Sequence, residues 1–416
     1  MGSLRRLLPS RVRGAVVLVL AGAGVLGCRA CPKSDPPPVQ DAPCQSRECY
    51  PAVEAATADG LAASLAASAA IPPACPRPLQ VLALSGGVAG APFTAGVLVG
   101  WTEAGTRPMF DVVSGISSGS LIGGYAFLGP KYDPELRRLI LNLKTSDLFK
   151  FRPLSSMICD GAFGSAKPAK KLIRGVFHDA FLADLRQAHA EGRRFFVGTM
   201  SLQTKRLVTW DIGAIASSGR PDADELVRKV LLAAISWPGA FPPVEFDVEV
   251  NGHCYHELHC DAGAAAMTFV RFGALPGCPG RCTPIRLGSL AGSQLYVLAS
   301  RKLYSDPEPV SEHALCRLGL SVSAIFEALT RADIARLYSF CALSGMRFHL
   351  LALPADYHGK PPSFKCLYPR EAPQLFAMGH RMGVNGPCWR LTPPGAEQGE
   401  EAVPRDGAHI KPCCSK

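Results

Sequence analysis

The stretch FDVVSGISSGSLIGGYAF places Ser117 between Gly115 and Gly119. An apolar run that includes the β-branched pair Val112 and Val113 precedes it and predicts a buried strand, and apolar residues at helical spacing follow it. Glycine on each side permits a tight turn between strand and helix, because it brings no Cβ into the turn. A serine at the tip of such a turn lies at the positive end of a helix, where it can act as the nucleophile of acyl transfer.

Helix capping is the simpler explanation for the same residues. Ser117 or Ser118 would then accept hydrogen bonds from the amides of the first helical turn. The G-x-S-x-G pattern fits both explanations, so the surrounding sequence has to distinguish a nucleophile from a cap.

A second glycine cluster lies in the stretch VLALSGGVAGAPFTAGVLVGW. It predicts a strand at 81–84, then a loop, then a helix with Pro92 in its first turn. Consecutive glycines at the start of a helix expose backbone N–H groups to an anion, which is either a phosphate or the oxyanion of acyl transfer. A dinucleotide site is the weaker alternative, because Gly86, Gly87 and Gly90 do not form the pattern G-x-G-x-x-G.

A carboxylate follows downstream in the stretch YHELHCDAGAAAM, at Asp261. An Asn-Gly turn signal before it predicts a hairpin whose second strand ends at Asp261. The histidines and cysteines of this strand suggest a metal site. However, Cys254 and Cys260 are six residues apart, about 20 Å on an extended strand, so they cannot bind one ion or pair with each other. We therefore expect no metal and no cofactor.

The two loops and the aspartate together resemble the motifs of the patatin-like phospholipases, and particularly the bacterial lipoproteins of that family. The first motif of the family is a glycine-rich oxyanion loop, the second is the serine elbow, and the third is a D-G-G or D-G-A sequence that supplies an aspartate base. The resemblance implies a dyad of Ser117 and Asp261 without a histidine. It also implies oxyanion donors in the loop of Gly86, Gly87 and Val88, and an acyl-lipid substrate such as a membrane phospholipid.

Several positions depart from the family's motifs. Val88 replaces the third loop glycine, Gly90 occupies an Arg/Asn position, Ala91 replaces another glycine, and Asp261 is followed by Ala262. The branched side chain of Val88 disfavours a positive φ, so this change could impair the oxyanion loop. The alternative function is therefore a catalytically impaired, membrane-tethered protein of the same fold that binds lipid or a partner.

A serine–aspartate–histidine triad is the chemical rival of the dyad. Histidines follow Asp261 in the chain order of the α/β-hydrolases, although no distinctive motif surrounds any of them. They are His313, His349, His358 and His380.

The elements that must position these residues form an alternating pattern. Short apolar runs alternate with helical patterns, which predicts an α/β fold with a largely parallel sheet. The resemblance, which covers roughly 80–389, implies a three-layer α/β/α patatin-like sandwich. We expect one acyl hydrolase domain at 79–394, preceded by a Pro/Ala-rich tether at 28–78 and followed by a loosely ordered tail at 395–416.

Residues 1–27 have the organisation of an export signal. Four arginines and no acidic residue precede and accompany the apolar run AVVLVLAGAGVL, which is too short to span a bilayer. The run ends in VLGC, which resembles the lipobox of bacterial lipoproteins and predicts lipidation of Cys28. We expect an exported lipoprotein anchored to the membrane through Cys28. Arg29 follows the cysteine, and in bacterial lipoproteins the absence of Asp at that position favours the outer membrane by convention.

The composition is that of a globular protein: 48% of the 416 residues are hydrophobic and 19% are charged. The net charge of +10 falls to +6 without the four arginines of residues 1–27, and it is too diffuse to indicate a nucleic-acid partner. In an oxidising compartment the other fifteen cysteines are candidates for disulfides, and the stretch CPGRC at 278–282 could close a small loop.

Overall fold

A computed structural model describes residues 77–151, 162, 164–250, 253–271, 290–307, 310, 312–359 and 368–400. The chain divides into two compact units. Among the described residues, the smaller unit consists of Phe246–Glu257, and the larger unit contains all the others. Several predicted features lie outside the described residues: the signal peptide, Cys28, the tether up to residue 76, the Cys278–Cys282 loop and the tail from residue 401.

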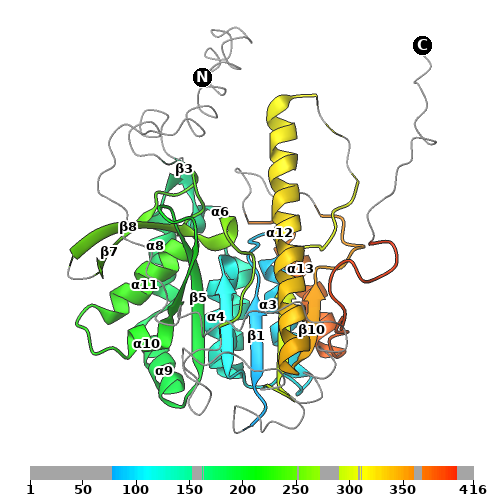
Figure 1. The fold of residues 1–416 in the computed structure, drawn as a ribbon, viewed down its shortest axis with the longest axis horizontal. Coiled ribbons are helices and arrows are strands. Elements are labelled where there is room, and N and C mark those ends of the chain that lie inside the picture. Colours follow the sequence, from blue (N-terminus) through cyan, green and yellow to red (C-terminus); the bar gives the residue numbers. More distant parts are fainter. Residues whose placement is uncertain are drawn as a thin grey trace, which may run out of the picture. The chain divides into compact units, whose positions relative to one another are not determined.

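An eight-stranded sheet organises the fold, with strands in the order β10-β9-β1-β2-β5-β8-β7 and with β6 paired to β5 (Figure 1). Strands β10, β9, β1, β2 and β5 run parallel to one another, whereas β6 and β8 are antiparallel to β5. The predicted α/β fold with a mostly parallel sheet is therefore confirmed. The strands are β1 (Gln80–Leu84), β2 (Val112–Ile116), β5 (Arg194–Ser201), β6 (Leu207–Asp211), β7 (Val244–Val250), β8 (His253–Asp261), β9 (Gln294–Ala299) and β10 (Arg347–Ala352), beside a small pair formed by β3 (Lys150–Phe151) and β4 (Gly164–Ser165).

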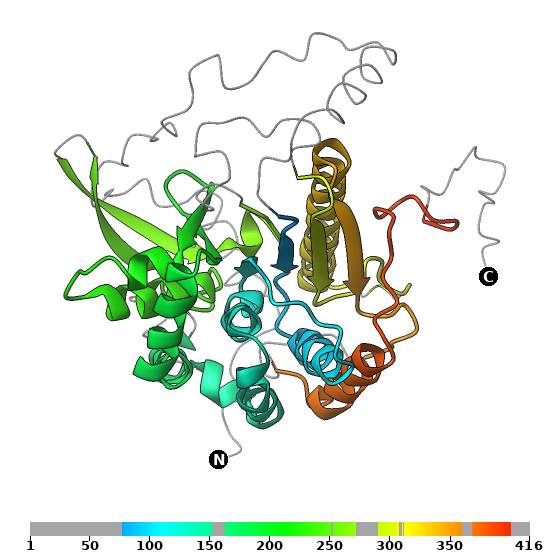
Figure 2. The same cartoon turned by 90° about the horizontal axis from the view of Figure 1, so that it is seen from below.

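Helices cover both faces of the sheet (Figure 2). On one face, Ile334, Leu337 and Cys341 of α12 (Ala314–Ser344) join a buried cluster with Val81 and Val112 of the central strands. Successive strand residues face opposite sides, so the alternate residues of β1 and β2 contact the helices of the other face. Those helices include α3 (Ala91–Glu103), α4 (Ser118–Leu128) and α13 (Ala372–Val384). The other helical segments are η3 (Pro130–Tyr132), α5 (Asp133–Asn142), α6 (Thr145–Leu148), α8 (Lys167–Val176), α9 (Asp179–Ala190), α10 (Ile212–Ala216), α11 (Ala223–Ala234) and η4 (Ala262–Ala264).

Helices α3 and α13 pack with their backbones almost in contact. A Cβ at Gly96 of α3 would lie 2.2 Å from the carbonyl oxygen of Phe376, and a Cβ at Gly379 of α13 would lie 2.1 Å from that of Phe93. Only glycine fits at such positions. The pairing joins a helix near the end of the chain to the helix that follows the glycine-rich loop.

The beginning of the predicted tail is held in place by charge. Arg390 binds both carboxylate oxygens of Glu400, at 2.5 and 2.6 Å, and this pairing lowers the pKa of Glu400 to about 2. Glu400 is thereby linked to Arg390, whose backbone pairs with that of Leu350 in β10. In the part of the chain that the structure describes, no helix combines the length and apolarity needed to cross a bilayer.

Five cysteines lie within the described ranges, and all five are free thiols: Cys254, Cys260, Cys316, Cys341 and Cys388.

Candidate active site

The turn between β2 and α4 holds Ser117 in a strained conformation. Its φ is 53° and its ψ is −125°, a region that side-chain-bearing residues rarely adopt. A Cβ at Gly115 would lie 2.4 Å from the carbonyl oxygen of Gly119, and a Cβ at Gly119 would lie 2.7 Å from that of Leu84. The two glycines are thus required by close backbone contacts, while the strain falls on the serine itself.

Capping does not explain this serine cluster. Ser117 is the N-cap residue of α4, yet its side chain makes no capping hydrogen bond. The buried Oγ of Ser118 has no hydrogen-bond partner among the residues with described positions. The hydroxyl of Ser120 bonds instead to the Gly115 carbonyl at 3.0 Å, which closes the turn. The capping interpretation is therefore wrong, and the side chain of Ser117 is half-buried and directed elsewhere.

Sheet register brings Ser117 to Asp261. Ile116, the last residue of β2, pairs with Gly198 of β5, and the next residue of β5, Thr199, pairs with Asp261 of β8. Because β2 and β8 flank β5, the two side chains reach the same level of the sheet from opposite sides of one strand. The Ser117 side chain lies close enough to the carboxylate of Asp261 to lower its pKa.

Asp261 is a buried carboxylate with few partners. Its side chain is 1% exposed, and burial raises its pKa to about 6. Ser117 and the Gly263 amide, which donates a hydrogen bond at 2.8 Å, act in the opposite direction and lower the pKa. A carboxylate with a pKa near neutrality accepts a proton more readily than a solvated one, so this environment suits a general base.

The glycine-rich loop after β1 lies beside the serine. A Cβ at Gly86 would be 3.3 Å from Cβ of Ser117. The amide of Gly86 donates to the carbonyl of Met267 at 3.0 Å, so this predicted oxyanion donor is already engaged. Within the described chain, the amides of Gly87 and Val88 have no hydrogen-bond partner. These two amides therefore fit an oxyanion better than that of Gly86.

The backbone of the loop does not require a positive φ at Val88, which is the conformation that its branched side chain would disfavour. Gly87 takes the positive φ, at 140°, whereas Val88 is not among the described residues with positive φ. The loop is anchored at Gly90, where a Cβ would lie 1.9 Å from the carbonyl oxygen of Ser300. The valine side chain thus occupies a position that does not require glycine.

Asp333 of α12 is a site residue that the sequence did not reveal. It is 2% exposed and accepts a hydrogen bond from the amide of Met267 at 2.7 Å. Met267 in turn accepts the amide of Gly86. Asp333 therefore fixes the segment that holds the glycine loop. No local motif surrounds it, and its only signal is an acidic residue on the buried face of an amphipathic helix.

Apolar side chains adjoin the carboxylate. Trp237 Cζ3 lies 3.3 Å from the position of a Cβ at Gly263, and the Met267 sulfur lies 3.7 Å from it. The ring of Phe326 packs edge-on against Trp237 with 5.1 Å between centroids. Both rings are half-buried. These side chains form an apolar wall that would suit an acyl chain.

The histidines of the rival triad have other partners. His349 Nε2 pairs with Gln294 at 2.7 Å, His358 Nδ1 with Asp306 at 2.9 Å, and His380 Nε2 with Glu103 at 2.8 Å. His313 is exposed at the start of α12. Among the described residues, Ser117 and Gly263 are the groups that lower the pKa of Asp261, and no histidine is one of them, so the geometry favours a dyad over a triad.

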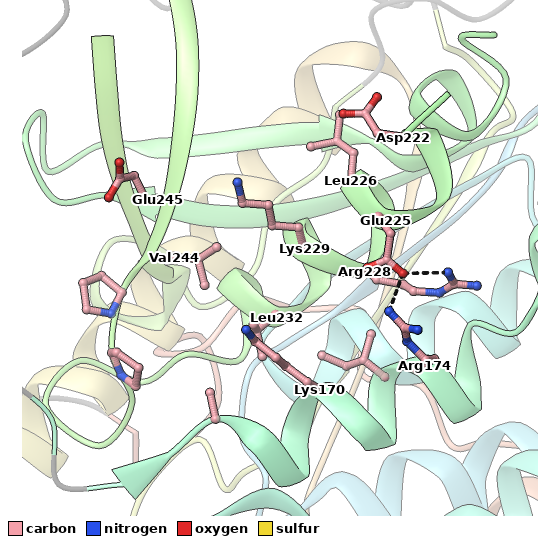
Figure 3. Close-up of a pocket in the computed structure, with 14 residues that line it drawn as sticks. Lys170, Arg174, Asp222, Glu225, Leu226, Arg228, Lys229, Leu232, Val244 and Glu245 are labelled. Carbon is pink, nitrogen blue, oxygen red and sulfur yellow. Dashed lines mark hydrogen bonds and ion pairs between the residues drawn. The ribbon is translucent and has the colours of Figure 1, made fainter. Parts of the chain in front are cut away.

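A separate cavity of about 660 Å³ lies between α8, α11 and the segment before β7 (Figure 3). Its walls mix four basic with three acidic residues, and Glu225 pairs with both Arg174 and Arg228. None of its lining residues belongs to the serine turn, the glycine loop or the Asp261 segment.

Comparison with known proteins adds to this geometry. Residues 82–272, which include both loops and Asp261, match the model of a family described as "Patatin-like phospholipase". A search of curated proteins gave no match.

Among solved structures, VipD from Legionella pneumophila is similar at 12% identity and a TM-score of 0.37, covering 74% of this chain and 66% of VipD. The type III effector protein ExoU is similar at 16% identity and a TM-score of 0.25, covering 75% of this chain and 53% of ExoU. The chain thus spans about two thirds and about half of these two structures.

Proposed function

We propose that this chain, whose residues 82–272 match the model of the patatin-like phospholipase family, is a lipid acyl hydrolase in which Ser117 is the nucleophile and Asp261 the base. The observation that carries the proposal is the proximity of Ser117, held at φ 53°, to the carboxylate of Asp261, which is 1% exposed and whose pKa Ser117 lowers. Strain at the serine and burial of its partner are costs to stability, and such costs are concentrated at functional sites.

The reaction follows from this pair. Asp261 takes the hydroxyl proton while Ser117 Oγ attacks the ester carbonyl, and the amides of Gly87 and Val88 stabilise the oxyanion. Collapse of the tetrahedral intermediate breaks the ester C–O bond, and Asp261 returns the proton to the departing alcohol. Water then attacks the acyl-enzyme, giving its proton to Asp261, and the fatty acid leaves as Ser117 is restored.

A phospholipid or lysophospholipid is the proposed substrate. Support comes from the family and from the apolar wall of Trp237, Met267 and Phe326 beside the carboxylate. The backbone amides at the loop and at the start of α4 would meet the polar end of the ester, while the acyl chain contacts the wall.

Labelling with a fluorophosphonate probe tests the nucleophile, with Ser117→Ala as the control. We expect labelling of the native chain and none of the variant. Turnover of esters of graded chain length should be lost in both Ser117→Ala and Asp261→Asn. Turnover that persists in Asp261→Asn would contradict the dyad.

One observation favours the alternative, an impaired protein that binds lipid without turnover. The Gly86 amide is engaged by Met267, which reduces the number of donors in the loop. Losing one oxyanion donor costs about two to three powers of ten in rate. Labelling of Ser117 by the probe, combined with lipid binding and no turnover of any ester, would support this function in place of hydrolysis.

Attachment to a membrane through Cys28 is a further part of the proposal. The basic segment of residues 1–27, its apolar run and the VLGC sequence support it, and we propose the outer membrane as the location of this lipoprotein. Mass spectrometry of the mature chain should find a diacylglyceryl group on Cys28. An unmodified N-terminus beyond Cys28 would refute it.

A further inference from the structure

The first half of α12 has an unusual surface for an exposed helix. Apart from Leu320, all residues whose exposure is described between Cys316 and Ile325 are exposed, so the exposed residues of this half include apolar ones. Leu318, Val322 and Ile325 are 52%, 40% and 62% exposed, and their i, i+4, i+7 spacing places them on one face. Exposed helix faces ordinarily carry charged residues, and this one does not.

The first half of α12 also contains few charged residues. Residues 314–326 read ALCRLGLSVSAIF and contain a single charged residue, Arg317. The C-terminal half differs, because there Ile334, Leu337 and Cys341 are buried against the sheet. Stability of the fold therefore explains the apolar residues of the second half but not those of the first.

The exposed half of α12 ends close to the candidate active site. Phe326, at the end of this segment, packs against Trp237, and Trp237 lies beside Gly263, two residues after Asp261. Figure 1 shows this half of α12 extending beyond the sheet. At a rise of about 1.5 Å per residue, thirteen residues form a rod of about 20 Å.

We propose that residues 314–326 of α12 are the surface by which this protein docks on a phospholipid bilayer. The inference rests on the proposed function, because it assigns the surface from which that site would take its substrate. A helix with an apolar face and a cation suits the boundary between acyl chains and headgroups. Arg317 supplies that cation and complements the phosphate of a headgroup. A bilayer contains the acyl chains that the apolar wall of Trp237, Met267 and Phe326 would bind. A protein partner bound to this face would not supply such chains, so the bilayer is the proposed occupant.

Two matched double variants test the surface. Leu318→Glu with Ile325→Glu places two acids on the docking face. Val384→Glu with Leu391→Glu is the control, because these residues are also apolar and exposed, at 41% and 60%, but lie outside α12. Adsorption is measured by co-sedimentation of the full chain with phosphatidylcholine vesicles containing phosphatidylglycerol. Each variant carries Ser117→Ala for this measurement, so that binding is observed without turnover.

We expect the α12 variant to lose about tenfold or more in adsorption and the control to keep it, since buried apolar area and charge attraction set interfacial binding. With Ser117 intact, hydrolysis of vesicle phospholipid should fall by a similar factor, while hydrolysis of a dissolved short-chain ester stays unchanged. Arg317→Glu should weaken adsorption to vesicles with phosphatidylglycerol more than to phosphatidylcholine alone.

Unchanged adsorption of the α12 variant would overturn the proposal. Equal loss on both substrates would also overturn it, because the effect would then be damage to the site. If sedimentation velocity finds a native dimer that the α12 variant dissociates, the face binds a second copy instead. Adsorption that depends on α12 without hydrolysis of either substrate would contradict the hydrolase and leave the docking surface standing.

Discussion

The two glycine-bearing turns of the site carry their strain on different residues. In the turn after β2, the positive φ falls on Ser117, and the neighbouring glycines are required because a Cβ would meet backbone atoms at 2.4 and 2.7 Å. In the loop after β1, the positive φ falls on Gly87, and Val88 next to it takes an ordinary conformation. A glycine in a motif can therefore be required for one of two reasons. Either another backbone segment leaves no room for a Cβ, or the glycine itself has a positive φ, and the structure is needed to distinguish these reasons.

The serine turn and the glycine-rich loop also differ in the contacts that hold them in place. The serine turn is rigid because its contacts are between backbone atoms, so it presents Ser117 in one position to Asp261. The loop depends on hydrogen bonds from elsewhere: the Gly86 amide is held by Met267, and Met267 is held by Asp333. Substitutions in the turn should therefore act on the nucleophile directly, whereas those near the loop should act through the oxyanion.

The largest expected effect is at the reacting pair. Ser117→Ala removes the nucleophile and Asp261→Asn removes the base, so each should lower kcat by about four powers of ten or more. Thermal unfolding of each variant serves as the control for folding. Residual activity within about tenfold of the native chain in either variant would contradict the assignment of that residue.

Gly119→Ala should have the next largest effect. Its Cβ would meet the carbonyl oxygens of Leu84 and Ser85 at 2.7 and 2.8 Å, both backbone atoms that cannot move cheaply. We expect a loss of about a hundredfold in activity and of a few kcal/mol in the free energy of unfolding, since overpacking of a tight interior is costly. Gly175→Ala in α8 is the matched control, because nothing lies within 4 Å of its Cβ. The control should be neutral or more stable by up to about 1 kcal/mol.

Asp333→Ala probes the support of the loop. It leaves the amide of Met267 without an acceptor and frees the segment that holds Gly86, so activity should fall by about ten- to a hundredfold. Asp333→Asn keeps one acceptor oxygen and should restore part of the loss. A positioning role predicts lower kcat with little change in KM. A variant that is less stable but fully active per folded molecule would argue against that role.

The pH dependence is set by Asp261. Its pKa of about 6 means that the ionised base is lost below that value, so kcat/KM should fall about tenfold for each pH unit below pH 6. Stability has the opposite dependence. The folded pKa is raised, so the contribution of this group is present below its unfolded pKa and is lost as pH rises through about 6.

Asp261→Asn should therefore be more stable than the native chain at pH 8, by up to about 3 kcal/mol, and the difference should vanish near pH 4. Denaturant unfolding across this range measures it. A native chain that hydrolyses ester equally well at pH 5 and pH 8 would show that Asp261 is not the base.

The candidate reacting groups could be proposed from the sequence because they lie in local patterns. The strand–turn–helix around Ser117, the loop of Gly86 and Gly87, and the hairpin ending at Asp261 all form as predicted. The pairing of Thr199 with Asp261 and of Ile116 with Gly198 could not be predicted, because sheet register depends on contacts between distant segments.

Two features of the site escaped prediction for the same reason. The bond from the Met267 amide to Asp333 joins residues 66 apart in sequence, and nothing in the helix around Asp333 marks it. Engagement of the Gly86 amide is likewise a tertiary contact. The predicted obstacle at Val88 arose from assigning the positive φ to the wrong residue, since the structure gives it to Gly87.

The smallest expected effect is that of Val88→Gly. This substitution tests directly whether Val88 or Gly87 carries the unusual backbone conformation of the loop. If Val88 obstructs the oxyanion loop, Val88→Gly should restore the family's glycine and raise kcat by about a hundredfold or more, because a recovered donor is worth that much. If Gly87 alone carries the unusual conformation, the same substitution should change kcat by less than about threefold. It should also lower the free energy of unfolding by about 0.5–1 kcal/mol, because glycine loses more backbone entropy on folding. Gly87→Ala is the matched variant: at φ 140° and with Ser300 2.9 Å from its Cβ, it should lose most of the activity that Val88→Gly retains.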